Sequence, residues 1–247
     1  MIYERLLAPL DGFHAAIEAF RAGGAAGANV TLPFKLDAYQ YANELTERAR
    51  LAGAVNTLKF DGAQILGDNT DGAGLCKDIV DNLKVPIAGA RILLIGAGGA
   101  ARGVIGPLLS AKPQIVTMSN RTLSKAEAIA KRFASLGPVT AVAPAHLALQ
   151  RFDILINATS ASLADSLPGI PAECFRPGVL AYEMMYGQGA TPFMALAAGA
   201  GAHTADGLGM LVEQAAEAFY FWRGVRPATA EIIEQLRAQI LAQSRSV

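Results

Sequence analysis

Two polar clusters in the N-terminal part of the chain carry side chains that could transfer a proton. The first is the stretch GANVTLPFK, which holds Asn29, Thr31 and Lys35. The second is GDNTDG, with Asp68, Asn69 and Asp71, preceded by Asn56 in AVNT. An ionised lysine is a poor base, but it becomes useful when it relays a proton with a partner carboxylate. Lys35 beside Asp71 would form such a pair.

Each cluster also has a purely structural interpretation. GDNTDG is rich in residues that favour turns, and Pro33 is compatible with an ordinary strand end. A calcium loop fits poorly, because the third and fifth positions counted from Asp68 are Thr70 and Gly72, which break the D-x-[DN]-x-[DN]-G pattern. Taken singly, the clusters leave turn structure and chemistry open.

The residues before Lys35 would hold its side chain in place. Pro33 fixes its own φ and biases Leu32 toward an extended backbone, while Phe34 can anchor in the core. Together they would hold the Lys35 side chain still against a substrate.

A glycine-rich stretch, LLIGAGGAARG, lies between an apolar run and a helix-forming segment. Gly96, Gly98 and Ala101 fit G-x-G-x-x-G/A, a spacing that permits a tight turn and a close approach of the backbone to a pyrophosphate at a helix N-terminus. Strand, loop and helix come in the required order, so the stretch predicts a dinucleotide site. A dinucleotide beside a proton-transferring pair indicates hydride transfer at a carbon that bears a hydroxyl.

The residues after the next strand predict which dinucleotide is bound. An acidic residue about 20 positions after the glycines would hydrogen-bond a ribose 2′-hydroxyl. This chain has SNRTLSK there, with Asn120, Arg121, Thr122 and Lys125. Arginine offers a planar, bidentate donor set for a phosphate, so we expect NADP rather than NAD. In the alternative interpretation, Arg121 is only a solvated residue at a helix start.

Composition and charge exclude several classes of function. The 247 residues are 52% hydrophobic and 17% charged, which is typical of a globular protein with one large domain or two modest ones. The 21 basic and 21 acidic residues balance, and no basic run indicates nucleic acid or an anionic membrane. The longest apolar stretch, 92–109, is interrupted by Arg102 and several glycines and is a poor membrane span.

Cysteine and histidine usage favours a cytoplasmic protein without a metal. The N-terminal sequence lacks a signal-peptide pattern, and Cys76 and Cys174 are far apart, as expected for inert thiols in a reducing compartment. His14, His146 and His203 show no ligand spacing to one another or to a cysteine. We therefore expect no metal site.

The predicted order of helices and strands differs between the part of the chain before Arg91 and the part after it. The N-terminal part predicts a helix at HAAIEAFRAGG, a strand at GANVTL, a helix that starts near Asp37 and runs on to Ala49, and a hairpin at AVNTLKF-DG-AQIL. From Arg91 the strands RILLI, QIVTM, VTAV, FDILINA and GVLAYEM alternate with helical segments, and two helical stretches follow at 208–222 and 228–242. This rhythm predicts an α/β protein with a parallel sheet.

Six motifs occur in the order seen in shikimate dehydrogenases: GANVTLPFK, AGAVNTL, GDNTDG, GAGGAARG, NRT and ADGLGMLVEQA. The chain resembles this family over nearly its whole length. The resemblance implies reduction of 3-dehydroshikimate to shikimate with NADPH, in the route to chorismate and the aromatic amino acids. It implies a smaller α/β substrate domain at 1–84, completed by C-terminal helices at 208–247 that pack back on it, and a Rossmann NADP domain at 85–207. The expected partner is a small-molecule substrate, and the expected state is a monomer or homodimer.

The resemblance also implies a role for individual residues. Lys35 matches the catalytic lysine, and Asp71 matches its carboxylate partner. The substrate would contact Asn29, Thr31, Asn56, Tyr186 and Gln214; the pyrophosphate Gly96, Gly98, Gly99 and Ala100; the 2′-phosphate Asn120, Arg121, Thr122 and Lys125; and the nicotinamide would lie near Met184 and Gly207.

The chain departs from the family pattern in two places. Family members usually begin with a strand and helix carrying a Ser-x-Ser motif that binds the substrate carboxylate, whereas MIYERLLAPLDGF resembles what normally follows that segment. Two such hydrogen bonds, at about 1.5–3 kcal/mol each, correspond to roughly 10²–10⁴ in binding or turnover. An upstream start, a truncated product and a degenerate copy are the three explanations that we consider. The second departure is Glu183 in YEMMYG, where the family more often has Asp.

Two further functions stay open on the sequence alone. One is an NADP-binding protein without useful catalysis, because the carboxylate anchor is missing. The other is a related dehydrogenase acting on quinate or another cyclic hydroxy acid, perhaps with NAD, although Arg121 argues against NAD.

Overall fold

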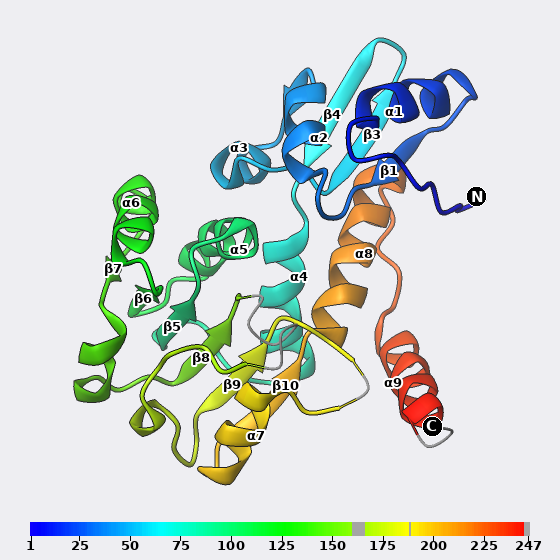
Figure 1. Cartoon of the computed structure of the whole chain (residues 1–247). Coiled ribbons are helices and arrows are strands. Elements are labelled where there is room, and N and C mark those ends of the chain that lie inside the picture. The colour runs from blue at the N-terminus through cyan, green and yellow to red at the C-terminus, as the bar shows by residue number, and fades with distance from the viewer. Residues whose placement is uncertain (160–165, 188, 245–247) are drawn as a thin grey trace.

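The computed structural model describes residues 1–159, 166–187 and 189–244, and within these residues the chain forms two sheets that lie at opposite ends of the molecule (Figure 1). Helices α4 (Asp71–Lys77) and α8 (Leu208–Arg223) run side by side between the sheets and pack against each other. The molecule is therefore an α/β protein, as the sequence predicts.

The smaller sheet is built from the N-terminal residues, and its strand order is β1-β3-β4-β2. Strand β3 pairs antiparallel with β1 and β4, while β2 pairs parallel with β4. Its strands and accompanying helices are β1 (Gly27–Asn29), β2 (Glu44–Leu45), β3 (Thr57–Asp61), β4 (Gln64–Asp68), α1 (Phe13–Ala22), α2 (Lys35–Tyr41) and α3 (Glu47–Ala52). The predicted hairpin at Asp61-Gly62 is confirmed, with Gly62 in the left-handed region at φ 58°.

The single helix predicted from Asp37 to Ala49 is wrong. Helix α2 starts at Lys35, two residues before Asp37, and ends at Tyr41. Asn43 then donates to the Ala63 carbonyl at 2.9 Å and accepts from the Ile65 amide at 2.8 Å, which draws the chain into β2 beside β4. A second helix, α3, follows, with the Thr46 hydroxyl accepting from the Ala49 amide.

Phe34 anchors the segment before Lys35, as predicted. Its ring stacks on Phe13 with centroids 5.3 Å apart and packs against the apolar core of the smaller sheet, which includes Ile17, Val30 and Leu58. The Leu32–Pro33 peptide bond is cis. Lys35 follows directly as the first residue of α2.

The larger sheet is fully parallel, with the strand order β10-β9-β8-β5-β6-β7. This is the doubly wound order of a Rossmann fold, in which ligands bind where the strand order reverses, at the carboxyl ends of β5 and β8. Apolar clusters cover both faces of the sheet. The strands are β5 (Arg91–Ile95), β6 (Ile115–Ser119), β7 (Val139–Ala141), β8 (Ile154–Asn157), β9 (Leu180–Glu183) and β10 (His203–Asp206).

The helices that accompany this sheet are mostly at the predicted places. They are α5 (Gly99–Ser110), α6 (Leu123–Phe133) and α7 (Pro192–Gly199), with short turns at η1 (Asp78–Asn82), η2 (Pro144–Leu149) and η4 (Ala172–Cys174). Sequence patterns missed α7 and β10. Strand β10 is short and polar and lies at the sheet edge, where a strand has no need of apolar residues on both faces.

The C-terminal helices connect to different parts of the molecule. Helix α8 reaches the smaller sheet, where the Trp222 indole donates to the Leu58 carbonyl at 2.8 Å. Helix α9 (Ala230–Ser244) contacts α8 and also reaches the larger sheet, where the Arg237 guanidinium bonds Asp206 of β10 at 2.6 Å. No helix in the described residues is both long and apolar enough to cross a bilayer.

Glycines let α4 approach its two neighbouring helices closely. A Cβ on Gly72 would lie 2.5 Å from Pro107 and 2.7 Å from the Gly103 carbonyl of α5. A Cβ on Gly74 would lie 2.6 Å from the Gln214 amide nitrogen of α8. Helix α4 is thus fixed against the nucleotide-loop helix on one side and against α8 on the other.

We expect Gly74→Ala to destabilise the protein by about 1–3 kcal/mol, because the added methyl group meets backbone atoms that cannot move without shifting α8. Urea unfolding measures the change. Gly169→Ala is the matched control, because a Cβ there would meet no atom within 4 Å. Equal stability of the two variants would contradict the proposed close packing.

Candidate functional site

The structure brings Lys35 and Asp71 together, although they are 36 residues apart in sequence. The Lys35 ammonium lies 2.6 Å from the Asp71 carboxylate, and the two side chains are 25% and 12% exposed. Each residue begins a helix, Lys35 at α2 and Asp71 at α4. Asp71 lies in the first turn of α4. The ammonium has three donors, so the ion pair leaves Lys35 able to donate to a ligand.

Asn56 holds the second oxygen of the same carboxylate. Its amide nitrogen donates to Asp71 Oδ1 at 2.8 Å, while Lys35 binds Oδ2. The amide oxygen of Asn56 accepts from the Thr70 backbone amide at 2.9 Å. Asn56 is only 3% exposed, so its orientation is set by the protein. The Asp71 carboxylate is therefore fixed at both oxygens.

Two more predicted residues join this network. Gln214 on α8 accepts from the Thr70 hydroxyl at 3.2 Å and from Asn56 at 3.4 Å. Asn29 donates to the Thr57 hydroxyl at 3.2 Å, which in turn donates to Asn56 at 2.9 Å. Residues from the smaller sheet, α4 and α8 thus form one continuous polar cluster.

Thr31 and Tyr186 lie outside this cluster. The Thr31 carbonyl accepts from the Phe34 amide at 3.0 Å, and the Thr31 side chain is exposed. Tyr186 is 48% exposed in the segment after β9. Within the described part of the chain, neither side chain hydrogen-bonds to the cluster around Asp71.

A half-buried arginine, Arg48, fixes the turn that precedes Asp71. The fully buried Asp68 accepts from Arg48 Nε at 2.7 Å and from the Thr46 hydroxyl at 2.6 Å, and Arg48 also bonds Glu217 of α8 at 2.9 Å. Burial alone would lower the pKa of Arg48, but the bonds to the two carboxylates outweigh it and raise that pKa. GDNTDG is therefore both a turn and the support of the candidate catalytic carboxylate.

The nucleotide loop lies at the carboxyl end of β5. Gly96 adopts φ 110°, a conformation that favours glycine, and a Cβ there would lie 3.0 Å from the Ala158 carbonyl. A Cβ on Gly98 or Gly99 would meet no atom of the described residues within 4 Å, so with respect to these residues the loop backbone is open on that side. Ala101 packs into the core at the third motif position. These features fit a dinucleotide pyrophosphate at the start of α5.

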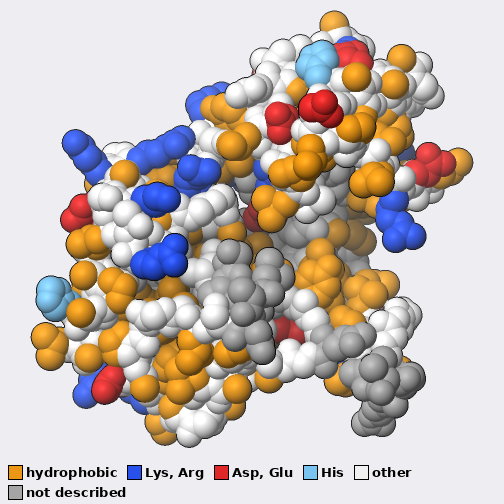
Figure 2. All heavy atoms as spheres, in the orientation of Figure 1, with side chains coloured by type: hydrophobic (Ala, Val, Ile, Leu, Met, Phe, Trp, Pro, Cys, Tyr) orange, Lys and Arg blue, Asp and Glu red, His pale blue; other side chains and the backbone are white. Residues whose placement is uncertain are grey.

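Basic residues follow the neighbouring strand β6. Arg121 and Lys125 are exposed, and in the described structure neither forms an ion pair. The Asn120 side chain donates to the Thr122 carbonyl at 2.9 Å, which closes the turn before α6. Figure 2 shows Lys and Arg side chains gathered over the region of α6. The arrangement leaves this end of the sheet positively charged.

Met184 and Gly207 meet at the far side of the sheet. The Gly207 amide donates to the Met185 carbonyl at 3.0 Å, and a Cβ on Gly207 would lie 2.2 Å from the Met184 carbonyl. Glu183 is buried and accepts from the Asn157 side chain at 2.8 Å. The turn after β9 is therefore held against the start of α8.

Sequence patterns missed two contributors to the site. Thr70 lies inside GDNTDG, and that motif was the available signal for it. No sequence pattern indicated Gly103. It matters because the α5 backbone comes close to the Asp71 carboxylate there: a Cβ on Gly103 would lie 3.5 Å from Asp71 Oδ2. Helix α5, which begins at the nucleotide loop, thus adjoins the Lys35–Asp71 pair. No group of three or more His, Cys, Asp or Glu in the described residues could hold a metal ion.

Comparison with known proteins identifies the family. The family models for the shikimate dehydrogenase substrate binding domain, shikimate / quinate 5-dehydrogenase and the shikimate 5′-dehydrogenase C-terminal domain match residues 1–58, 75–164 and 207–237. A protein of Dechloromonas aromatica named shikimate dehydrogenase (NADP(+)) is 56% identical over 241 residues, which cover 97% of this chain and 88% of the relative. The chain belongs to the shikimate dehydrogenase family. A second relative with the same name, from Herminiimonas arsenicoxydans, is 59% identical over 240 residues, with the same coverage.

Solved structures similar to this chain have the same fold. An Ael1 enzyme from Pseudomonas putida superposes with a TM-score of 0.89 at 48% identity, covering 93% of this chain and 84% of that one. The shikimate 5-dehydrogenase of Thermus thermophilus, solved with NADP(H) and shikimate, has a TM-score of 0.82 at 32% identity, covering 94% and 85%. The Rossmann fold predicted from the sequence is confirmed.

Another buried carboxylate, Asp78, follows α4 directly. It accepts from the Tyr182 hydroxyl at 2.6 Å and from Asn82 at 2.8 Å. Burial raises the pKa of Asp78 above its ordinary value; these two hydrogen bonds lower it, and nearby Glu213 and Asp206 raise it further. The folded protein therefore holds the Asp78 proton more tightly than the unfolded chain does.

The Asp78 carboxyl should make stability fall as pH rises. Its contribution is largest below the ordinary aspartate pKa and declines as pH rises from that value through the raised folded-state pKa. We expect Asp78→Asn to weaken this decline, measured by urea unfolding at a series of pH values. Asp81→Asn is the control, because Asp81 is exposed and Lys77 lowers its pKa. An unchanged pH profile in Asp78→Asn would contradict the assignment.

Proposed function

We propose that this protein interconverts 3-dehydroshikimate and shikimate with NADP, working as a reductase in the route to chorismate and the aromatic amino acids. The observation that carries the proposal is the 2.6 Å contact of Lys35 with Asp71, in a polar cluster that adjoins the nucleotide-loop helix. The names of the relatives, shikimate dehydrogenase (NADP(+)), support the same reaction.

The cofactor would lie along the carboxyl ends of the parallel strands. Bound NADPH supplies a hydride to the substrate carbonyl carbon. The loop backbone at Gly96, Gly98, Gly99 and Ala100 would hold its pyrophosphate, at the N-terminus of α5. The residues proposed for the 2′-phosphate are Asn120, Arg121, Thr122 and Lys125, and those proposed near the nicotinamide are Met184 and Gly207.

Lys35 would donate the proton that the carbonyl oxygen needs as it becomes a hydroxyl. In the oxidation direction the same pair would take up the hydroxyl proton. Asp71 holds the ammonium in place, and Asn56 keeps the carboxylate oriented toward it. The polar cluster would thus hold the Lys35 ammonium proton near the substrate oxygen, as general acid–base catalysis requires.

Hydroxyl groups of the substrate would bind to polar groups around this pair. Asn56 and Gln214 lie within the cluster, and Asn29 is linked to it through Thr57. Thr31 and Tyr186 would have to approach the substrate from outside the cluster, since in this structure they do not bond to it.

Substrate binding and NADP binding would belong to two different domains. We assign residues 1–84 with the C-terminal helices at 208–247 to substrate binding, and residues 85–207 to NADP binding. The Trp222–Leu58 hydrogen bond and the contact of α8 with α4 support this division for α8, whereas α9 contacts the larger sheet through Arg237.

A quinate dehydrogenase is the second candidate, because the family model that matches residues 75–164 describes shikimate and quinate 5-dehydrogenases together. NADPH formation from NADP⁺ with shikimate, and separately with quinate, tests the two substrates. Faster turnover with shikimate supports the proposal. A folded protein that binds NADPH but oxidises neither substrate would support NADP binding without catalysis.

We expect Lys35→Met to lower kcat by about 10²–10⁴-fold, the usual contribution of a positioned proton donor. NADPH affinity, measured by fluorescence titration, should stay nearly unchanged, because Lys35 lies in the polar cluster and not on the nucleotide loop. Lys59→Met on β3 is the matched control and should keep full turnover. Equal loss of turnover and NADPH binding in Lys35→Met would contradict the role of Lys35.

A further inference from the structure

Arg102 lies in the first turn of α5, immediately after the nucleotide loop. Among the described residues its buried Nε has no hydrogen-bond partner, and its guanidinium forms no ion pair. A buried donor without a partner is destabilising, and more so on a charged group. An anion that binds beside α5 would remove this cost.

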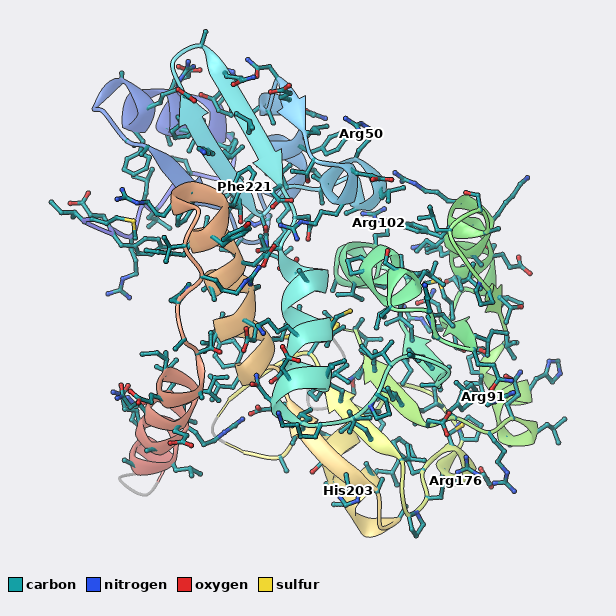
Figure 3. All side chains as sticks on the ribbon, turned by 180° about the vertical axis from the view of Figure 1, so that it is seen from behind. Arg50, Arg91, Arg102, Arg176, His203 and Phe221 are labelled. Carbon is teal, nitrogen blue, oxygen red and sulfur yellow. The ribbon has the colours of Figure 1, made fainter. Side chains whose placement is uncertain are left out.

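The neighbours of α5 show which way Arg102 faces. Gly106, one turn further along, faces Phe133 of α6 and Leu51 of α3, whereas Gly103 faces Asn69 and Asp71. Side chains one turn apart share a helix face and point toward the helix N-terminus. Arg102 therefore faces the gap between α3 and α6, and its guanidinium points back toward the loop. Figure 3 shows Arg102 in this gap, beyond α5 and facing α3.

The elements on both sides of this gap carry several basic residues. In the described structure none of them forms an ion pair with a carboxylate. They come from α3, from α5, from the turn before α6 and from α6 itself, and are Arg50, Arg102, Arg121, Lys125, Lys131 and Arg132.

Two of these arginines are already satisfied by backbone carbonyls. Arg132 donates to the Arg50 carbonyl at 3.1 Å, and Arg50 donates to the Leu45 carbonyl at 3.0 Å. Arg102 follows the nucleotide loop directly in the sequence, and among the described residues it forms no such bond. Its guanidinium is therefore available to a dinucleotide bound at the loop.

We propose that Arg102 binds the 2′-phosphate of NADP and so sets the preference for NADP over NAD. This inference rests on the proposed function. The loop backbone would hold the pyrophosphate. Arg102 faces α6 rather than α4, where Asp71 lies; Arg121 precedes α6 and Lys125 lies in its first turn. A guanidinium can bind a phosphate through two parallel hydrogen bonds.

Dissociation constants for NADPH and NADH, measured by fluorescence titration, test the proposal. Arg102→Leu should weaken NADPH binding about 10- to 100-fold, the range for a lost charge-assisted contact, and leave NADH binding within about twofold. Arg102→Lys should restore part of the NADPH affinity. The kcat at saturating NADPH should not change, because Arg102 faces away from Asp71.

Arg132→Leu is the matched control, since Arg132 belongs to the same basic gap but already bonds a carbonyl. It should leave both affinities unchanged. Adenosine 2′,5′-bisphosphate and 5′-AMP provide a second readout without the nicotinamide, and only the bisphosphate should lose affinity in Arg102→Leu. Circular dichroism checks that each variant is folded.

Equal weakening of NADPH and NADH, or no weakening of either, would overturn the role of Arg102. Failure of the wild-type protein to bind NADPH would overturn the proposed function itself. Tight wild-type binding of NADPH that Arg102→Leu leaves intact would overturn the inference about Arg102 alone.

Discussion

The ion pair of Lys35 with Asp71 depends on where helix α4 is held. Asp71 is the first residue of α4. This helix packs against α5 at Gly72 and against α8 at Gly74, so closely that neither position has room for a side chain. Because the interior is close-packed, a shift of α4 would also disturb both neighbours. The candidate catalytic carboxylate is therefore fixed relative to the nucleotide loop by helix packing, and not only by its own hydrogen bonds.

Hydrogen bonds and ion pairs also fix the position of Asp71, in addition to the helix packing. Both oxygens of Asp71 are occupied, one by Lys35 and the other by Asn56. Arg48 and Asp68 hold the preceding turn and tie it to α8 through Glu217. Buried polar networks rigidify a structure when every member is satisfied and are costly when one is missing. The site thus combines a fixed proton-transferring pair with an open loop backbone beside it.

The sequence predicted most of what depends on local patterns. The apolar runs identified the buried strands of the larger sheet, the Asp61-Gly62 pair identified the hairpin, and the glycine spacing identified the loop after β5. It failed where a distant contact decides local structure. Asn43 ends α2 by bonding to a strand 22 residues away, and β10 needs only one neighbouring strand.

The candidate site shows the same limit. Lys35, Asp71 and Asn56 could be expected to meet because they belong to recognisable motifs. Gly103 and Arg102 matter because of the elements that pack around α5, and no local sequence pattern indicates which elements those are. The roles of Thr31 and Tyr186 stay predictions, because the structure does not bring them into the cluster.

The most direct test of the account is a double-mutant cycle on Lys35 and Asp71, read as kcat/KM for shikimate oxidation. If the two side chains act as one proton-transferring unit, Lys35→Met combined with Asp71→Asn should be about as slow as the slower single variant. Losses that multiply in the double variant would show that the two groups act independently, and would contradict the pair as the centre of the site.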